Sequence, residues 1–553
     1  MAVTCAWRSS PAAVGLSAGA VPRPVGTRPA ALAAPAPWRR CLPRTDRRAV
    51  LAPPPSATSL KNPFSFLFTK SADEGEPARQ EPPPPEPATG LYVKLQPQAI
   101  NSEGELAYPL ALVHALQAVK SVGVEGVLVP VAWGLAEGAA PGAYDFGVYK
   151  RLAAMLEDCG LKMQVSLKFC AVGGVGLPAW VVAEAESNPD LLFQDQYGNA
   201  LWDCLTIGAD DEQVLLGRTA AEAYRDFMAA FRDEFAGQLG SLITEVIVGM
   251  GPHGELRYPS YPQVNGMWHF PGVGEFQCYD AFLRDRLRGA AEAAGQPGWG
   301  ESGPRSAGHY CNLPHETEFF AEEHGGWDTE QGAFFLQWYS SELLQHGDTM
   351  LSLARGVFGE GPAAPKLGFK LPVVHWWYRT KAHAAELTAG VYRTESVNGY
   401  RDLAELAAKH RAFLQVSCAE MSDSEQSDLA MSSPQGLISD IREAAAEKGV
   451  RLAVENCSTR FDESALQQME RNVLHSLEPP AQSMCFVAMD DDMFKAYHWG
   501  PFSSFIKSLS AAIAEQQPAQ TPEPPADTSA EEADAAASSG QGSPFPWPLK
   551  KFF

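Results

Sequence analysis

Between residues 91 and 515 short apolar runs alternate with longer amphipathic stretches. Eight of these runs have the length and apolar content of buried strands: residues 91–95, 126–131, 162–169, 243–250, 367–375, 414–420, 450–455 and 484–488. Apolar positions recur with helical spacing between them, over residues 108–122, 144–159, 217–235, 334–355, 404–413 and 436–448. Such alternation is typical of parallel strands joined by helices, and eight units predict a closed α/β structure, the (β/α)8 TIM barrel.

The connection after the fourth predicted strand is unusually long. Over a hundred residues, rich in Tyr, Trp, Pro and Gly, separate Met250 from Leu367. A simple crossover needs far fewer, and long insertions of this kind usually form lids or binding lobes. We therefore expect a small lobe beside the mouth of the barrel.

The two ends of the chain differ in composition from the barrel. Residues 1–48 contain eight Arg, no Lys and one acidic residue, Asp46, which is the profile of an organelle transit peptide. We expect plastid targeting, to the chloroplast stroma, with the mitochondrion as the alternative. The rest of the chain divides into a Pro-rich linker at 49–90, a barrel at 91–515 and a low-complexity tail at 516–553.

Each end segment also holds one aromatic cluster, at residues 62–68 and 544–553. One interpretation is a strap that packs on the barrel, and the other is a short motif that binds a protein partner. The sequence leaves both open.

Overall charge narrows the choice of ligand. The net charge is -23, so nucleic acid and anionic membrane surfaces would be repelled, and no apolar run reaches the roughly 18 residues that span a bilayer. The ten cysteines include no C-x-x-C pair, which favours mostly reduced thiols. Without a phosphate loop, a dinucleotide fingerprint or an H-E-x-x-H helix, we expect no metal and no cofactor.

Two glutamates stand where a barrel presents catalytic groups. Glu255 follows Gly254 after the fourth strand, and Glu455 ends the seventh. Structural alternatives are an ion pair of Glu255 with Arg257, and a helix-capping role for Glu455. Because strands four and seven lie three apart in a ring of eight, the carboxylates could face each other, which suggests glycoside hydrolysis; an inverting pair needs a gap of roughly 6.5–9.5 Å.

Aromatic residues are concentrated after the predicted strands. His375, Trp376, Trp377 and Tyr378 follow strand five, and the long insertion supplies Tyr258, Tyr261, Trp268 and Phe270. Aromatic rings pack on sugar faces, although each ring alone is more often part of a core.

Residues 254–261, Gly-Glu-Leu-Arg-Tyr-Pro-Ser-Tyr, resemble the signature around the general acid of plant β-amylases, glycoside hydrolase family fourteen. Residues 268–280, 334–348, 375–390 and 418–426 support the resemblance, which extends over about residues 91–510. It implies that Glu255 is the general acid and Glu455 the general base in the inverting release of β-maltose from non-reducing ends of α-1,4-glucan. It further implies substrate-binding roles for Lys370, His375, Ser417, Asn456 and Cys457, with Ser417 in place of the usual Thr.

The chain also departs from the family pattern. Pro130 stands where the family has a sugar-binding Asp, Cys170 replaces a His, the lid after it is about seven residues shorter in our alignment, and an Arg near strand eight has no counterpart. Hydrogen bonds to charged groups contribute about 1.5–3 kcal/mol each, so losing three predicts a cost of roughly 6 kcal/mol, on the order of 10⁴ in rate. We expect reduced turnover in starch metabolism, and the alternative is an inactive glucan-binding or regulatory protein.

Redox control through Cys170, Cys418 and Cys457 is a further hypothesis, because all three map near the expected cleft. Inert buried thiols are the simpler interpretation.

Overall fold

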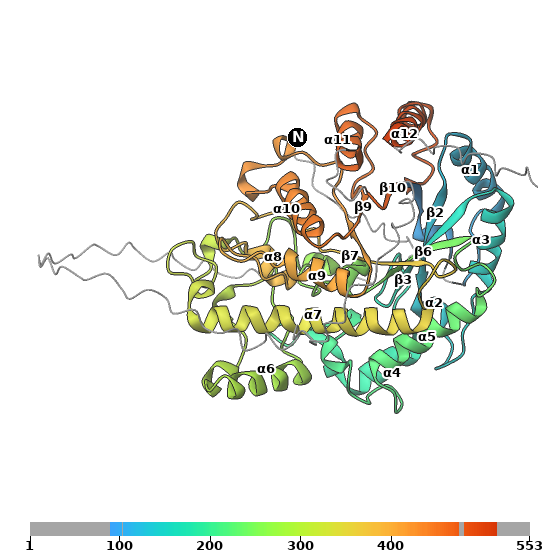
Figure 1. Cartoon of the computed structure of the whole chain (residues 1–553). Coiled ribbons are helices and arrows are strands. Elements are labelled where there is room, and N and C mark those ends of the chain that lie inside the picture. Colours follow the sequence, from blue (N-terminus) through green and yellow to red (C-terminus); the bar gives the residue numbers. More distant parts are fainter. Residues whose placement is uncertain (1–88, 102, 475–480, 517–553) are drawn as a thin grey trace, which may run out of the picture.

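The computed structural model describes residues 89–101, 103–474 and 481–516. The predicted transit peptide, the Pro-rich linker up to residue 88, the tail from residue 517 and both aromatic clusters lie outside these residues. Eight parallel strands close a barrel in the order β1-β10-β9-β8-β7-β6-β3-β2 (Figure 1). The predicted (β/α)8 fold is therefore confirmed. Its strands are β1 (Gly90–Leu95), β2 (Gly126–Ala132), β3 (Lys162–Lys168), β6 (Ile243–Val248), β7 (Lys366–Lys370), β8 (Phe413–Val416), β9 (Leu452–Glu455) and β10 (Ser483–Met489).

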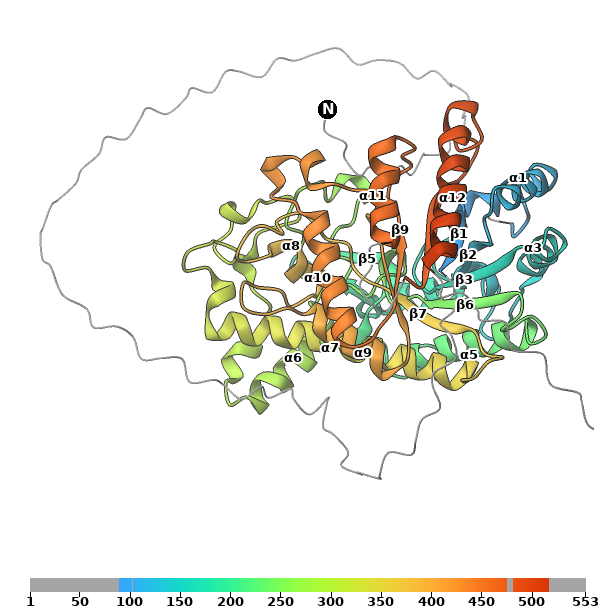
Figure 2. The ribbon, with the colours of Figure 1, turned by 45° about the horizontal axis from the view of Figure 1, so that its top comes forward.

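Helices surround the barrel because their apolar faces pack on the strands, and those at Gly147–Asp158, Ala220–Glu234 and Tyr400–Lys409 are amphipathic. In Figures 1 and 2, α11 and α12 lie side by side along one flank. The helices are α1 (Pro109–Ser121), α2 (Trp133–Ala136), α3 (Gly147–Asp158), α4 (Ala179–Ser187), α5 (Ala220–Glu234), α6 (Ala281–Ala293), α7 (Glu330–Phe358), α8 (Ala384–Ala389), α9 (Tyr400–Lys409), α10 (Pro434–Glu447), α11 (Glu463–Leu474) and α12 (Ala496–Gln516). No described helix has both the length and the apolar character that a bilayer crossing requires.

Several predicted element boundaries are wrong, among them the strand predicted at 367–375, which ends at Lys370, and left-handed residues explain two others. The helix predicted at 404–413 is α9, which ends at Lys409 because Arg411 has φ 50° and turns the chain into β8. The strand predicted at 414–420 stops at Val416, since Cys418 adopts φ 60°. Apolar residues resume after both positions, at Ala412 and at Ala419, so periodicity alone misses the turns.

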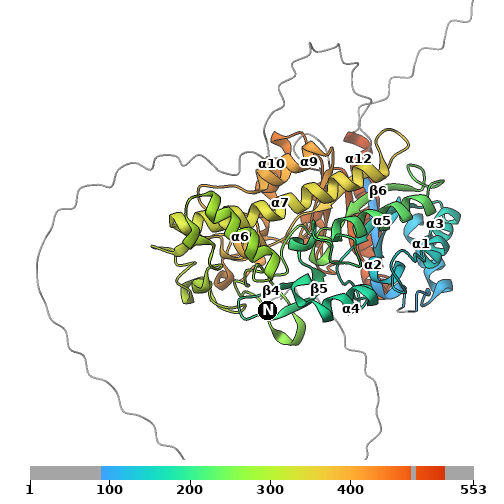
Figure 3. The same ribbon diagram turned by 90° about the horizontal axis from the view of Figure 1, so that it is seen from below.

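The long segment between β6 and β7 forms the expected lobe. It contains α6, a series of short turns and then α7, the 29-residue helix that returns the chain to the barrel. In Figures 1 and 3, α7 spans the molecule, with α6 against one end and α5 near the other. The hairpin of β4 (Leu192–Gln194) and β5 (Ala200–Leu205) adds a two-stranded sheet, and the backbone N–H of Tyr279 in the lobe donates to the carbonyl of Gln194.

Gly249 closes the contact between β3 and the end of β6. A β-carbon added there would lie 2.2 Å from the carbonyl oxygen of Leu167, which belongs to the backbone of β3 and has little freedom to move. Only glycine allows the two strands to approach so closely at this point. The chain direction after β6, and with it the position of Glu255, depends on this contact.

Replacing Gly249 by Ala should lower the free energy of unfolding by about 1–3 kcal/mol, because the new methyl group must push β6 away from β3. The measurement is urea unfolding followed by tryptophan fluorescence. Gly289→Ala is the control, since Gly289 is an exposed residue of α6 with nothing within 4 Å of the added carbon. An equal stability for Gly249→Ala and the wild type would contradict the argument.

Candidate active site

Backbone pairing places Glu255 beside β7. After β6 the chain turns through His253 and Gly254, both with positive φ, and Glu255 then pairs with Lys370 in a parallel bridge. The backbone N–H of Leu256 donates to the carbonyl of Lys370 at 2.8 Å, which fixes this register. Glycine is favoured at 254 because its φ of 83° strains other residues, and an added β-carbon would also lie 2.2 Å from Nζ of Lys168, which would have to move. The glycine before the carboxylate therefore makes room for a buried lysine.

Glu455 is the last residue of β9, between β8 and β10. Two side chains of the β8 segment hold its carboxylate: the hydroxyl of Ser417 donates to Oε1 at 2.7 Å, and Nε2 of Gln415 lies 3.2 Å from Oε2. The residue is 2% exposed. The hydroxyl of Ser417 thus holds the carboxylate of Glu455 in position.

Lys370, at the end of β7, bridges the two carboxylates. Its Nζ lies 2.5 Å from Oε1 of Glu455 and 3.4 Å from Oε1 of Glu255. These two oxygens are therefore separated by no more than the sum of those distances. The structure brings Glu255 and Glu455 together, and the ammonium group of Lys370 lies next to both carboxylates.

Burial and charge act in opposite directions on both acids. Burial raises the pKa of Glu255, but Lys370, Arg257 and His253 more than offset it, and the resulting pKa lies below the ordinary value. For Glu455 burial is again opposed, chiefly by Lys370, and the pKa falls to about 2. Both groups are ionised near neutral pH. A general acid must carry a proton, so Glu255 is in the wrong state for that step in this arrangement.

The ion pair of Glu255 with Arg257, considered from the sequence as a structural alternative, is present. Nε of Arg257 lies 2.7 Å from Oε2 of Glu255, and both side chains are buried. Arg257 also donates to the carbonyl of Tyr258 at 3.1 Å. Glu255 therefore has a cation at each oxygen, Arg257 at one and Lys370 at the other.

Sequence reasoning missed Lys168 and His253, which complete the charged centre. Nζ of Lys168, the last residue of β3, donates to the carbonyl of His253 at 2.8 Å. Burial, with the nearby cations Lys94 and Lys370, holds the pKa of Lys168 well below its ordinary value. Burial also lowers the pKa of His253 to about 3, helped by Arg257. A lysine at the carboxyl end of a predicted strand was the available signal for Lys168.

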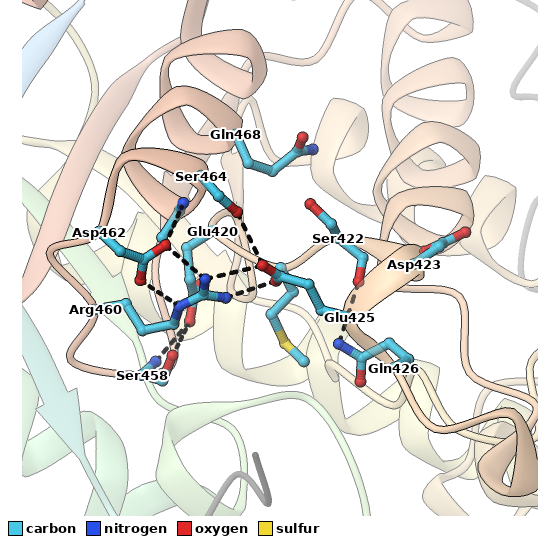
Figure 4. A network of polar contacts seen from close by, with 12 residues as sticks. Glu420, Ser422, Asp423, Glu425, Gln426, Ser458, Arg460, Asp462, Ser464 and Gln468 are labelled. Atoms are coloured by element: carbon cyan, nitrogen blue, oxygen red, sulfur yellow. Dashed lines mark hydrogen bonds and ion pairs between the residues drawn. The ribbon is translucent and has the colours of Figure 1, made fainter. Parts of the chain in front are cut away.

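A carboxylate clamp joins the loop after β8 to the loop after β9 (Figure 4). Glu420 is fully buried and accepts hydrogen bonds from the backbone N–H of Cys457 and from the N–H and hydroxyl of Ser458. Arg460 forms a two-pronged ion pair with Glu425 in the same figure. The loop that carries Ser417 is held to the loop that follows Glu455.

The remaining predicted substrate-binding residues, Asn456, Cys457 and His375, differ in how their polar atoms are hydrogen-bonded. Both ends of the Asn456 amide contact backbone, since Oδ1 accepts from Val487 N–H at 2.6 Å and Nδ2 donates to the Ser458 carbonyl at 2.8 Å. The half-buried Cys457 thiol lies 3.4 Å from Oε1 of Glu420. Nδ1 of the buried His375 has no hydrogen-bond partner among the described residues. Of the three, His375 alone has a buried side-chain atom without a hydrogen-bond partner among the described residues.

The opposite side of the barrel mouth is apolar where the sequence departs from the family pattern, at Pro130 and in the shortened lid. Pro130 pairs with Ser166 in β3 and lines a cavity of about 20 Å³, together with Pro97, Val172 and Val175 among others. That volume holds about one water molecule and is far too small for a glucose ring.

A tight turn stands at the position where the family pattern has a longer lid. Val172 and Val175 pair across Gly173 and Gly174, both with positive φ, and Gly173 packs on Pro97. Cys170 before the turn forms a disulfide with Cys204 in β5. The interpretation of the cysteines as reduced thiols is wrong for this pair, because the hairpin brings Cys204 next to the end of β3; the buried Cys418 and the half-buried Cys457 are free thiols.

The aromatic residues form a core between lobe and barrel instead of an open platform. Tyr258 is fully buried and stacks on Tyr339 with ring centroids 3.8 Å apart. Trp268 and Trp376 are buried against each other, and both indole N–H groups donate to the carbonyl of Gly272. The core interpretation accounts for these rings.

Comparisons with known proteins show that the barrel is that of a glycoside hydrolase, and they give the family. The model of glycosyl hydrolase family 14 matches residues 92–514. The chain is 43% identical over 413 residues to beta-amylase 1, chloroplastic, of Arabidopsis thaliana, covering 72% of each chain. It is 39% identical over 436 residues to a beta-amylase of Medicago sativa, covering 76% of this chain and 87% of that one.

A solved structure agrees with these relatives. The catalytic domain of the beta-amylase from Paenibacillus polymyxa superposes with a TM-score of 0.62 at 25% identity, covering 76% of this chain and 98% of that chain. The chain belongs to the β-amylase family, glycosyl hydrolase family 14.

Replacing Lys370 by Met should destabilise the protein at pH 7 by about 3–5 kcal/mol, because two buried carboxylates lose the cation they share. The wild type gains stability from Glu455 above pH 4.5 and loses it as the pH falls toward 2, since the folded pKa is about 2 and the ordinary value 4.5. In the variant the carboxylates should bind protons more readily, so its stability should rise as the pH falls from 7 toward 5.

The measurement is urea unfolding of both proteins between pH 4.5 and 7.5. Lys495→Met removes an exposed ion pair with Asp492 and serves as the control, for which no measurable change is expected. Parallel pH profiles for wild type and Lys370→Met would contradict the bridging role.

Proposed function

We propose that this chain binds the ends of α-1,4-glucan and hydrolyses them to β-maltose with strongly reduced turnover. Glu255 is the general acid and Glu455 the general base of this proposal. In the inverting reaction, Glu255 gives a proton to the oxygen of the leaving glucan, while Glu455 takes a proton from the water that attacks the sugar carbon from the other face. Both steps need room between the carboxylates and a protonated Glu255.

Lys370, which the resemblance assigns to a position shared by the family, lies within reach of both carboxylates at once and so sets a condition for the reaction. The reduction in turnover rests on the apolar side of the mouth, at Pro130. For the reaction, the bound sugar must move the ammonium away from at least one carboxylate and raise the pKa of Glu255. Both changes cost free energy, because the ion pairs are buried. Substrate binding has to supply that free energy.

The apolar side of the mouth limits the free energy that binding of the sugar can supply. Where the family pattern has an Asp, Pro130 offers no hydrogen bond to a sugar hydroxyl, and the cavity beside it is small. The turn at Val172 is tethered through Cys170 and packed on Pro97, so it has little freedom to close over a sugar. Together with the sequence estimate, these features favour a rate on the order of 10⁴ below that of an intact family member.

A second candidate is a glucan-binding protein without hydrolysis, which regulates starch metabolism. The unpartnered Nδ1 of His375 favours retained sugar recognition, because a buried ring nitrogen is stable only when it finds a partner. For both candidates we propose the plastid stroma as the location, supported by the Arg-rich residues 1–48 and by relatives whose names include chloroplastic.

Maltose release from soluble starch should be slow but should depend on Glu255. We expect the wild type to release maltose far more slowly than an intact β-amylase, and Glu255→Gln to release none above background, because the amide cannot protonate the leaving oxygen. Glu301→Gln, an exposed residue of the lobe, is the control and should match the wild type.

Glucan binding is measured separately, by sedimentation with insoluble starch and by titration with maltoheptaose. Binding with equal maltose release by wild type and Glu255→Gln would favour the second candidate. Turnover as fast as that of an intact relative would overturn the proposed reduction, and absence of both binding and turnover would overturn both candidates.

A further inference from the structure

The barrel has a cavity of about 320 Å³ at its amino-terminal face, away from the paired carboxylates. It lies where β7, β8 and β9 begin, whereas Lys370 and Glu455 are the last residues of β7 and β9. Five residues of β7 separate the two faces by about 13 Å. The cavity is therefore distinct from the candidate active site.

Four basic residues line this cavity, and none of its described lining residues is acidic. They come from different parts of the chain: Lys366 begins β7, Arg411 precedes β8, Lys448 follows α10, and Arg451 precedes β9. Such convergence is notable in a chain with a net charge of -23. Like charges repel, so gathering four of them favours an anionic ligand.

Stabilisation of helix ends accounts for part of this charge but not for all of it. Lys448 stands at the carboxyl end of α10, and Arg411 follows α9, where cations are favourable. Lys366 begins β7 and Arg451 precedes β9, so that reason does not apply to them; Arg451 donates to the carbonyl of Ala481 at 2.7 Å, and Nζ of Lys366 lies 3.5 Å from Oε1 of Gln482.

Two of the cations also have carboxylate neighbours at the rim. Arg411 pairs with Glu360 at 2.5 Å and Lys448 with Glu405 at 2.9 Å, and all four side chains are at least a third exposed. Exposed ion pairs contribute little, so an incoming anion with more charge can compete for both cations.

We propose that this cavity binds a small molecule carrying a phosphate group. Arg presents a planar fork that matches phosphate oxygens, and Lys adds point charges. The volume is at the lower end of the roughly 300–1,000 Å³ of small-molecule sites, which suits a phosphorylated sugar and excludes a polymer inside it. Leu367 and Phe413 supply an apolar wall for the uncharged part of the ligand.

Titration calorimetry of the full chain with inorganic phosphate and with glucose 6-phosphate at low ionic strength tests the proposal. We expect saturable binding that weakens as salt is added. The double variant Lys366→Gln/Lys448→Gln should bind at least about tenfold more weakly, since each lost charged contact is worth about that factor. Both side chains are partly or fully exposed, so the variant should fold.

The control is Lys150→Gln/Arg288→Gln, which removes two exposed ion pairs elsewhere and should bind like the wild type. Tighter binding of the ester than of inorganic phosphate supports a cavity that contacts the sugar, and equal binding supports one that contacts the phosphate group alone. Three results would overturn the proposal: no saturable binding of either probe, binding unchanged in the double variant, or displacement of the probe by excess maltose.

Discussion

The bridge from Lys370 to Glu255 and Glu455 is the interaction on which the centre of this molecule depends. Two ionised carboxylates placed close together in a buried site repel each other and lose their hydration, so a shared cation is needed to keep both charged. The position of that cation follows from the fold, because Lys370 ends β7, next to the extension of β6 and two strands from β9. Arg257 adds positive charge at the same point, and Lys168, whose pKa is lowered by burial, approaches closely at Gly254.

This balance gives the glutamates a structural role beside a chemical one. Removing one member of a buried ion pair leaves an uncompensated charge and costs several kcal/mol, so a chain that carried out little hydrolysis would still depend on Glu255, Glu455 and Lys370 for its stability. The presence of the signature Gly-Glu-Leu-Arg is thus weak support for turnover by itself. An active site differs from an inactive one in the residues around the carboxylates, and in particular in whether a bound sugar can displace Lys370 from Glu255 and Glu455.

The sequence was sufficient for the barrel, because eight apolar runs with helical spacing between them admit few other arrangements. It also predicted that Glu255 and Glu455 meet, since ring geometry follows from strand order. It did not predict the lysine between them, because the reach of a long side chain across two strands leaves no periodic signal. The disulfide of Cys170 with Cys204 escaped for a related reason: the partners are 34 residues apart and meet through a hairpin whose register the sequence does not specify. Arg411 and Cys418 ended their elements through left-handed backbone, which apolar patterning does not report.

The mouth of the barrel is therefore divided into two unequal sides. Along β6 to β9 the charged centre is held by short contacts and by the clamp of Glu420, so that side is rigid and polar. At β2 and in the turn after β3 the corresponding positions are Pro130 and the tethered Val172–Val175 turn, which are apolar. A glucan end gains hydrogen bonds on the first side and only contact on the second. In the proposed function, binding energy of that kind holds a sugar nearly as well before the reaction as at its transition state, and for that reason the proposal favours recognition of the chain end over its cleavage.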